Sequence, residues 1–300
     1  MLSSLLVAAD ILAITRSNAR TLCSSFLDSY SASLASGKAY WVESETAQGL
    51  IRELLDGLRY RRRSQLINTR SSLKGKKRAF KVDGKKTLSA TGAQRAAVTE
   101  FMIRFALAQP QLEFFSVLDV ARRIAGTGSL GVNRYAILVN GKGPPGGHYL
   151  LDLKQSLGSS VAAHFEALQP KSRSQAHRAV EVQLRMQAVS VALLQPVRFD
   201  DSAYVLRELQ PAEDRVTLDG SRRTMGEVNQ VLETIGRPVA WAQLRSAGRD
   251  GSAIADELIE FGMRKKWKSK LITAAQVCAA QVRKDSRTFN TAFDDGVFST

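Results

Sequence analysis

The choice of fold class rests on residues 122–141, RRIAGTGSLGVNRYAILVNG. This stretch holds three glycines within six residues, Gly126, Gly128 and Gly131, and it runs directly into a segment rich in β-branched and aromatic residues. Glycine permits the positive φ angles of a tight loop and lets backbone N–H groups come close to a ligand. The element that follows the loop therefore decides what kind of loop this is.

A dinucleotide-binding loop of this spacing opens a helix and is followed about twenty residues later by an acidic residue. Here the loop leads into VNRYAILV, in which Tyr135, Ile137 and Val139 favour a strand. The residue about twenty positions further on is Tyr149 or Leu150, and neither is acidic. The pattern excludes a Rossmann-type site.

The remaining arrangement is a glycine loop between two antiparallel strands over nucleotide phosphates, as in protein-kinase-like enzymes. It requires a lysine on the next strand and a carboxylate on the next helix. The segment YLLDLK places Lys154 on one face with Leu150 and Asp152, and the following helix carries Glu181. We expect Glu181 to orient Lys154 toward the phosphates, whereas an inward Asp152 needs a partner of its own.

A simpler alternative remains open for the same residues. The three glycines could form an irregular hairpin, with Lys154 a charge at the end of a strand and Glu181 a solvated helix residue. The positions of the Lys154 and Glu181 side chains distinguish the two interpretations.

The alternation and periodicity around the loop predict an α+β fold. It comprises a small antiparallel kinase-like sheet with the glycine loop and one packed helix, between mainly helical ends. Strands are predicted at about 115–125, 132–140 and 148–154 and within SAYVLRELQ, and helices at 91–109, with Thr91 or a neighbour as cap, and at 175–194. The predicted regions are 1–110, helical with a basic hairpin at about 74–90; 111–210, the nucleotide-binding lobe; and 211–300, helical.

The formal net charge is +15, which predicts attraction to polyanions or phosphorylated ligands. Lys and Arg are dense in the basic segment, Arg59–Lys86, where Asp83 and Gly84 suggest a type I′ hairpin turn. An alternative function is therefore non-specific binding of nucleic acid through this segment, although its aromatic residues are limited to Tyr60 and Phe80. A non-catalytic interaction module is the third hypothesis.

The cysteines and histidines predict neither a disulfide framework nor a metal site. Cys23 and Cys278 lie in no CxxC pair, and His148, His164 and His177 show no metal-ligand spacing. The opening apolar run is interrupted by an aspartate and is too short for a membrane span. We expect a cytoplasmic protein without a membrane partner.

Four segments carry a resemblance: RIAGTGSLG, RAVEVQLRMQAVS, YVLRELQP and VAWAQLRSAGRDGSAIADELIEFG. Over about residues 1–290 the chain resembles the bacterial family known as domain of unknown function 2252. That family is similar to the protein-kinase-like and aminoglycoside-phosphotransferase-like group, which implies binding of ATP and transfer to an unknown phosphate acceptor. Arg207 is a further candidate. The implied nucleotide site consists of Gly126, Gly128, Ser129, Gly131, Lys154 and Glu181.

In that family the segments resembling a kinase catalytic loop and a metal-binding acidic motif lie upstream of the glycine loop, and this chain begins after both. The resemblance therefore implies a fragment that binds nucleotide with an incomplete catalytic apparatus, and Mg²⁺ only where the upstream segment is present. Whether the chain is an enzyme stays open. Exposed apolar faces on a helix at residues 2–13 are the expected structural sign.

Overall fold

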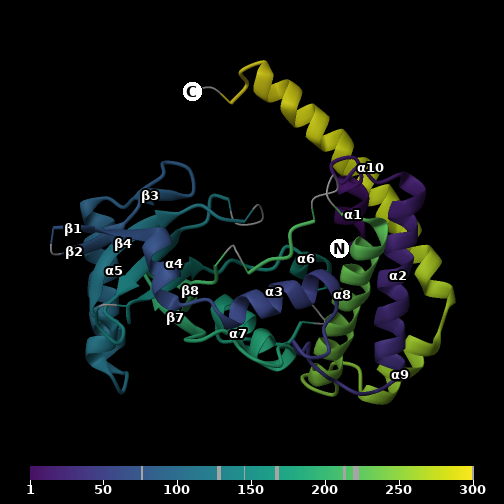
Figure 1. The fold of residues 1–300 in the computed structure, drawn as a ribbon, viewed down its shortest axis with the longest axis horizontal. Coiled ribbons are helices and arrows are strands. Elements are labelled where there is room, and N and C mark those ends of the chain that lie inside the picture. Colours follow the sequence, from purple (N-terminus) through teal and green to yellow (C-terminus); the bar gives the residue numbers. More distant parts are fainter. Residues whose placement is uncertain are drawn as a thin grey trace. The chain divides into compact units, whose positions relative to one another are not determined.

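The computed structural model describes residues 1–75, 77–126, 130–144, 146–165, 169–211, 214–218 and 223–298. It has an α+β fold with helical ends and small antiparallel sheets, as predicted (Figure 1). The chain divides into unit 1, Met1–Gly57 with Arg215–Thr300, and unit 2, Leu58–Asp214. The predicted helical region 1–110 is thus shared between the two units.

Unit 1 is built from helices. They are α1 (Leu2–Ala8), α2 (Arg16–Ala35), α8 (Met225–Ser246), α9 (Ala255–Met263) and α10 (Lys266–Asp294), and α3 (Gly49–Arg59) runs into unit 2 along the chain. Leu2, Leu5 and Leu6 are buried in one core with apolar residues of α2, α8 and α10. The expected exposed apolar face at residues 2–13 is therefore wrong for these leucines, because neighbouring helices cover them.

Two glycines let the helices of unit 1 approach closely. A Cβ atom at Gly236 of α8 would lie 2.6 Å from the carbonyl oxygen of Phe26, and one at Gly262 of α9 would lie 2.7 Å from the amide nitrogen of Ala35. Both neighbours are backbone atoms of α2, so the contacts leave no room for a larger residue. Small residues at these two positions fix how α8 and α9 pack on α2.

The main sheet belongs to unit 2 and has the strand order β3-β4-β5-β6-β8-β7, with every neighbouring pair antiparallel. Its strands are β3 (Thr87–Ser89), β4 (Val117–Arg123), β5 (Arg134–Val139), β6 (Tyr149–Gln155), β7 (Gln195–Phe199) and β8 (Ser202–Glu208). The predictions for β4, β5, β6 and β8 are confirmed. The sequence interpretation missed β7, and it extended the helix that precedes β7 too far.

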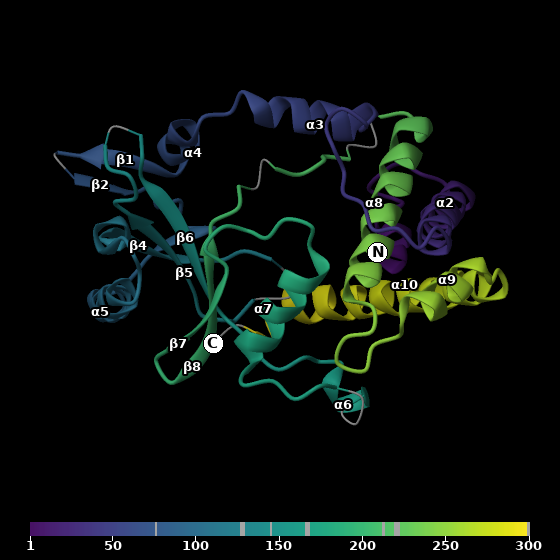
Figure 2. The same ribbon diagram turned by 90° about the horizontal axis from the view of Figure 1, so that it is seen from below.

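The helices of unit 2 are α4 (Arg63–Arg70), α5 (Gly92–Leu107), the 3₁₀ helix η1 (Leu112–Phe115), α6 (Ala162–Phe165) and α7 (Gln175–Met186). Helices α5 and α7 lie on opposite sides of the sheet (Figure 2). As predicted, Thr91 caps α5: its Oγ1 accepts the N–H of Gln94, and the Gln94 side chain accepts the N–H of Thr91. Both orphan amides at this helix start are satisfied.

The basic hairpin differs from the prediction. Strand β1 (Ser71–Lys74) pairs with β2 (Lys77–Phe80), whereas β3 pairs with β4. Asp83 does form a turn, but its Oδ1 accepts the N–H groups of Lys85, Lys86 and Thr87 at 2.7–2.8 Å. This carboxylate curls the chain after β2, so a type I′ turn at Asp83 that pairs the flanking segments is wrong.

Candidate functional site

Alternation along β6 gives the sheet of unit 2 two different faces. Leu151 and Leu153 are fully buried on the α5 face, which we define as the side packed against the apolar residues of α5. Asp152 and Lys154 point to the opposite side, the α7 face. Cross-strand pairing of Arg134 with Lys154 and of Arg207 with Asp152 puts both arginines on the α7 face as well.

Asp152 is the anionic centre of the α7 face. Its side chain is only 1% exposed, and Arg134 donates two hydrogen bonds to it, from Nε to Oδ1 at 2.6 Å and from Nη2 to Oδ2 at 2.7 Å. Arg207 approaches Oδ2 with its Nε at 3.4 Å. Arg134 also donates from Nη1 to the carbonyl oxygen of Ala125 at 2.9 Å, which ties the start of the glycine loop to the sheet. The partner that an inward Asp152 requires is therefore present.

Lys154 lies beside this pair without an ion-pair partner among the described residues. Burial is the main reason that the pKa of Lys154 lies below its ordinary value; Arg134 lowers it further, Asp152 raises it, and Arg207 lowers it again. Lys154 is half-buried, and an ammonium group in such a place with an open donor set is a poor contributor to stability and a good ligand for an anion.

Arg123 adds a further cation to the α7 face. Ala121 pairs with Ala136 across the strands, so Arg123, two residues further along β4, projects to the same side as Asp152. Burial is the main cause that lowers the pKa of Arg123, and the charge of Asp152 opposes the shift. Its guanidinium group has no hydrogen bond to the part of the chain that the structure describes. With Arg134, Lys154 and Arg207 it surrounds Asp152, which leaves a net positive charge.

A cavity of about 520 Å³ opens beside these groups. Lys154 and Arg207 of the sheet line it, and so do Ala179 and Gln183 of α7. Val132, the residue directly after Gly131, lines it as well. Side chains that are far apart in sequence thus meet in one space next to the end of the glycine loop. Positive charge and room for a ligand coincide there.

The glycine loop itself is described only at its ends, because Gly128 and Ser129 lie outside the described residues. Gly126 and Gly131 have φ angles of 83° and 80°. A Cβ atom at Gly131 would meet nothing within 4 Å, so backbone conformation and not space demands glycine at this position. Gly131 is itself exposed.

The structure does not bring Glu181 to Lys154. Glu181 is exposed, and no described ion pair joins the two residues. Helix α7 buries Ala176 and Val180 and turns Gln183 toward the cavity. Glu181, one residue after a buried position, is rotated by about 100° from it on the helix. The carboxylate whose charge acts on Lys154 is Asp152 instead.

Comparisons with known proteins agree with the resemblance. A model of the family described as "Uncharacterized protein conserved in bacteria (DUF2252)" matches residues 1–292. The chain belongs to this family. Nothing matches it among curated proteins or among solved structures.

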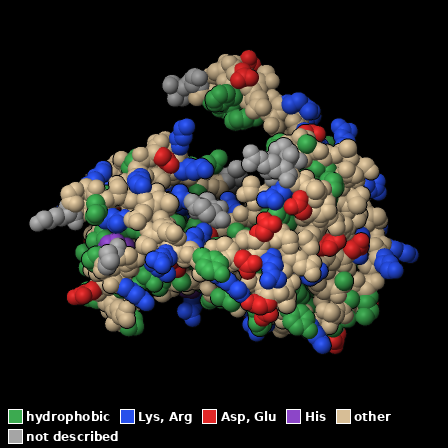
Figure 3. All heavy atoms as spheres, viewed as in Figure 1, with side chains coloured by type: hydrophobic (Ala, Val, Ile, Leu, Met, Phe, Trp, Pro, Cys, Tyr) green, Lys and Arg blue, Asp and Glu red, His purple; other side chains and the backbone are tan. Residues whose placement is uncertain are grey.

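Some arginines of the basic segment of this DUF2252 chain make contacts within the protein. Arg61 pairs with Asp214, and Arg63 pairs with Glu208 and lies over the ring of Tyr149, with its Cζ 3.5 Å from the ring centroid. On the side of unit 2 shown in Figure 3, Lys and Arg side chains are scattered among hydrophobic ones. Two of the arginines proposed to contact nucleic acid are therefore engaged within unit 2.

The three histidines have no common site. His148 is buried, with its Nδ1 3.0 Å from the carbonyl oxygen of Asn140, and His177 contacts Ser174 at the N-terminus of α7. His164 is exposed. Within the described ranges, no helix has both the length and the apolar character that a bilayer span requires.

Proposed function

We propose that the α7 face of unit 2 binds ATP or a related nucleotide, with the phosphates at Lys154 and Arg207. The observation that carries the proposal is that Lys154, Arg207 and Val132, the residue next to Gly131, line one cavity. Two cations and the end of a glycine loop beside one space favour a ligand with several negative charges. The net charge of +15 supports attraction of such a ligand over a longer range.

The charged residues of this face have separate tasks in the proposal. Asp152 is saturated by Arg134, so this pair acts as a buried brace that holds β5 and β6 in register. Lys154 has no such partner among the described residues and lines the cavity, so it is left to meet phosphate oxygens, while Arg123 adds positive charge on the same face. Arg207, whose side chain is 25% exposed, uses its Nε toward Asp152 and also lines the cavity.

The order of elements favours a nucleotide over a simple anion. A glycine loop joins antiparallel strands β4 and β5, the next strand brings the lysine, and the next long helix covers the cavity. Protein-kinase-like enzymes use the same succession of loop, lysine and helix around ATP. Our proposal departs from that pattern at the carboxylate, since Glu181 on the helix is exposed and Asp152 on β6, whose charge acts on Lys154, is itself paired with Arg134.

The proposal is limited to binding. Mg²⁺ prefers carboxylate and other oxygen ligands, yet the described ranges contain no cluster of three or more His, Cys, Asp or Glu side chains suited to a metal. Asp152, held by Arg134 and Arg207, is not available to an ion. The described residues of this site do not fit Mg²⁺, and we assign no step of phosphate transfer to them.

Thermal unfolding with and without ATP tests the proposal. A ligand at about one hundred times its Kd adds about 2.7 kcal/mol to stability, which raises the melting temperature measurably. Lys154→Ala removes a charge-assisted contact of about 1.5–3 kcal/mol, so we expect the affinity to fall roughly ten- to a hundredfold. Inorganic triphosphate should stabilise less than ATP if the base is also bound.

Two matched variants sharpen the result. Lys77→Ala removes an exposed lysine of the basic segment, and Glu181→Gln removes the carboxylate that the structure leaves in solvent. Neither should change the ATP-induced shift. Failure of ATP to stabilise the wild-type chain, or an undiminished shift in Lys154→Ala, would contradict nucleotide binding at this face.

A further inference from the structure

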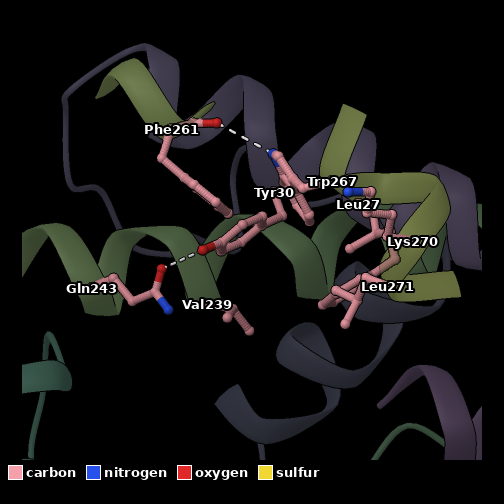
Figure 4. Close-up of a pocket in the computed structure, with 9 residues that line it drawn as sticks. Leu27, Tyr30, Val239, Gln243, Phe261, Trp267, Lys270 and Leu271 are labelled. Atoms are coloured by element: carbon pink, nitrogen blue, oxygen red, sulfur yellow. Dashed lines mark hydrogen bonds between the residues drawn. The ribbon is translucent and has the colours of Figure 1, made fainter. Parts of the chain in front are cut away.

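Unit 1 has a cavity that plays no part in the proposed nucleotide site. It measures about 550 Å³ and lies among α2, α8, α9 and α10 (Figure 4). Its volume falls in the range typical of small-molecule sites, as does a lining of mostly hydrophobic and aromatic side chains with few polar groups. The lining residues are Phe26, Leu27, Tyr30, Val239, Gln243, Phe261, Trp267, Lys270 and Leu271.

Three rings form a preorganised wall of this cavity. Phe261 and Trp267 stack with centroids 4.7 Å apart and an angle of 20°, and Tyr30 stands edge-on to Trp267 at 6.1 Å and 87°. The indole Nε1 donates to the carbonyl oxygen of Phe261 at 3.3 Å, which fixes the Trp267 ring (Figure 4). A fixed aromatic wall is a surface on which a flat ring stacks with little loss of entropy.

The polar groups of the cavity are unequally satisfied. Tyr30 donates its O–H to Oε1 of Gln243, and burial raises the pKa of Tyr30, so the hydroxyl stays protonated and committed to this bond (Figure 4). Lys270, in contrast, has no carboxylate within ion-pair distance in the described part of the chain. Its neighbour Lys268 does have one, Asp28, with Nζ 2.6 Å from Oδ1. The cavity therefore offers one open positive charge beside an aromatic wall.

We propose that this cavity of unit 1 binds a small aromatic carboxylate, with the ring against Tyr30 and Trp267 and the carboxylate toward Lys270. An aliphatic acid would use the charge but not the aromatic rings. A neutral arene would use the wall but not the charge. A phosphate ester fits less well, since a single lysine supplies fewer donors than the cluster on the α7 face.

Isothermal titration calorimetry of the full chain with 2-naphthoate measures the proposed binding. Val239→Trp puts a large ring into the cavity, and we expect it to weaken binding at least tenfold, by an order-of-magnitude estimate for a blocked pocket. Lys270→Gln should weaken 2-naphthoate about fivefold, as for a partly exposed ion pair. Lys284→Gln is the matched control, because Lys284 is also an exposed lysine of α10 but does not line the cavity.

Two further probes separate the charge from the ring. The neutral 2-naphthamide should bind wild type and Lys270→Gln equally, and decanoate should bind more weakly than 2-naphthoate. Quenching of Trp267 fluorescence by 2-naphthoate, lost in Trp267→Phe, would support stacking at the proposed wall. Circular dichroism checks that each variant folds, and Lys270→Gln still decides the question if Val239→Trp does not fold.

Several results would overturn the proposal. They are absence of 2-naphthoate binding at millimolar concentration, equal affinity in wild type and a folded Val239→Trp, or equal losses in Lys270→Gln and Lys284→Gln. Tighter binding of decanoate than of 2-naphthoate would reject the aromatic ligand class. Because every variant lies in unit 1, failure here leaves the ATP result on unit 2 unaffected.

Discussion

On the α5 face of the unit 2 sheet, Ile137, Leu151 and Leu153 are fully buried, whereas the α7 face of the same strands carries Asp152 and Lys154. The first face needs only apolar residues of the right size, and burial of their surface stabilises the fold. The second face also buries apolar residues of β5 and β6, but beside them it holds charged groups at a desolvation cost. The difference indicates that apolar packing alone accounts for the first face, whereas the second face combines structural contacts with groups that are available for recognition.

The largest test of this division is Asp152→Ala. Removing the carboxylate leaves Arg134 buried without its bidentate partner, and loss of one member of a buried pair costs about 3–5 kcal/mol. Urea denaturation should show this loss for unit 2. Glu100→Ala is the control, since it breaks an exposed pair with Arg104 on α5 and should cost less than about 1 kcal/mol. Equal effects would mean that Asp152 is not a structural brace.

A smaller test belongs to the opposite face. Ile137→Val deletes one buried methylene, and we expect a loss of about 0.5–1.5 kcal/mol in the free energy of unfolding. ATP affinity, measured under conditions where both proteins are folded, should stay unchanged. A change in affinity comparable to that of Lys154→Ala would show that the two faces are coupled.

The smallest expected effect is the pH dependence of Lys154. Its pKa in the folded chain lies below the ordinary value of 10.5, mainly because of burial. The charged form is thus penalised in the folded state. The penalty is complete below the folded pKa and disappears as the pH rises through that pKa to the ordinary value. Wild-type stability should therefore rise relative to Lys154→Met over this window.

Urea melts at a series of pH values measure this difference. A bound polyphosphate should raise the pKa of Lys154 and flatten the rise, because an adjacent anion favours the ammonium form. If the gap between wild type and Lys154→Met does not change with pH, Lys154 is more solvated than its position on the α7 face implies.

Much of unit 2 follows from local sequence signals. The alternation in Tyr135, Ile137 and Val139 predicts β5, and Thr91 as an N-cap residue predicts the start of α5. These features depend on residues close together in the chain. Strand β7 lacks such a signal, since it begins at Gln195 and Pro196 after a stretch that continues the pattern of α7.

The partners of Asp152 could not be read from local patterns. Arg134 is 18 residues away in sequence, and the two meet only because Ala136 pairs with Asp152 in the β5–β6 register. The available signal was weaker: an aspartate on an inward strand position demands a cation from a neighbouring strand. Which residue pairs with Asp152 depends on the register between the strands. The length and conformation of the glycine loop do not fix that register in advance.

The position of Glu181 shows a different limit. The helix was predicted, but its rotation about its own axis was not, and a change of one residue turns a side chain by about 100°. Ala176 and Val180, four residues apart, mark the buried stripe of α7. That spacing was visible in the sequence and places Glu181 off the stripe.

The division of unit 1 along the chain has a consequence for its synthesis. Helix α2 packs on α8 and α9. These two helices are synthesised only after all of Leu58–Asp214. Unit 2 is continuous in sequence, so it can complete its sheet during translation while α2 still lacks its neighbours. The nascent chain thus carries the apolar side of α2 unprotected through most of elongation, and this is the interval in which a chaperone would act.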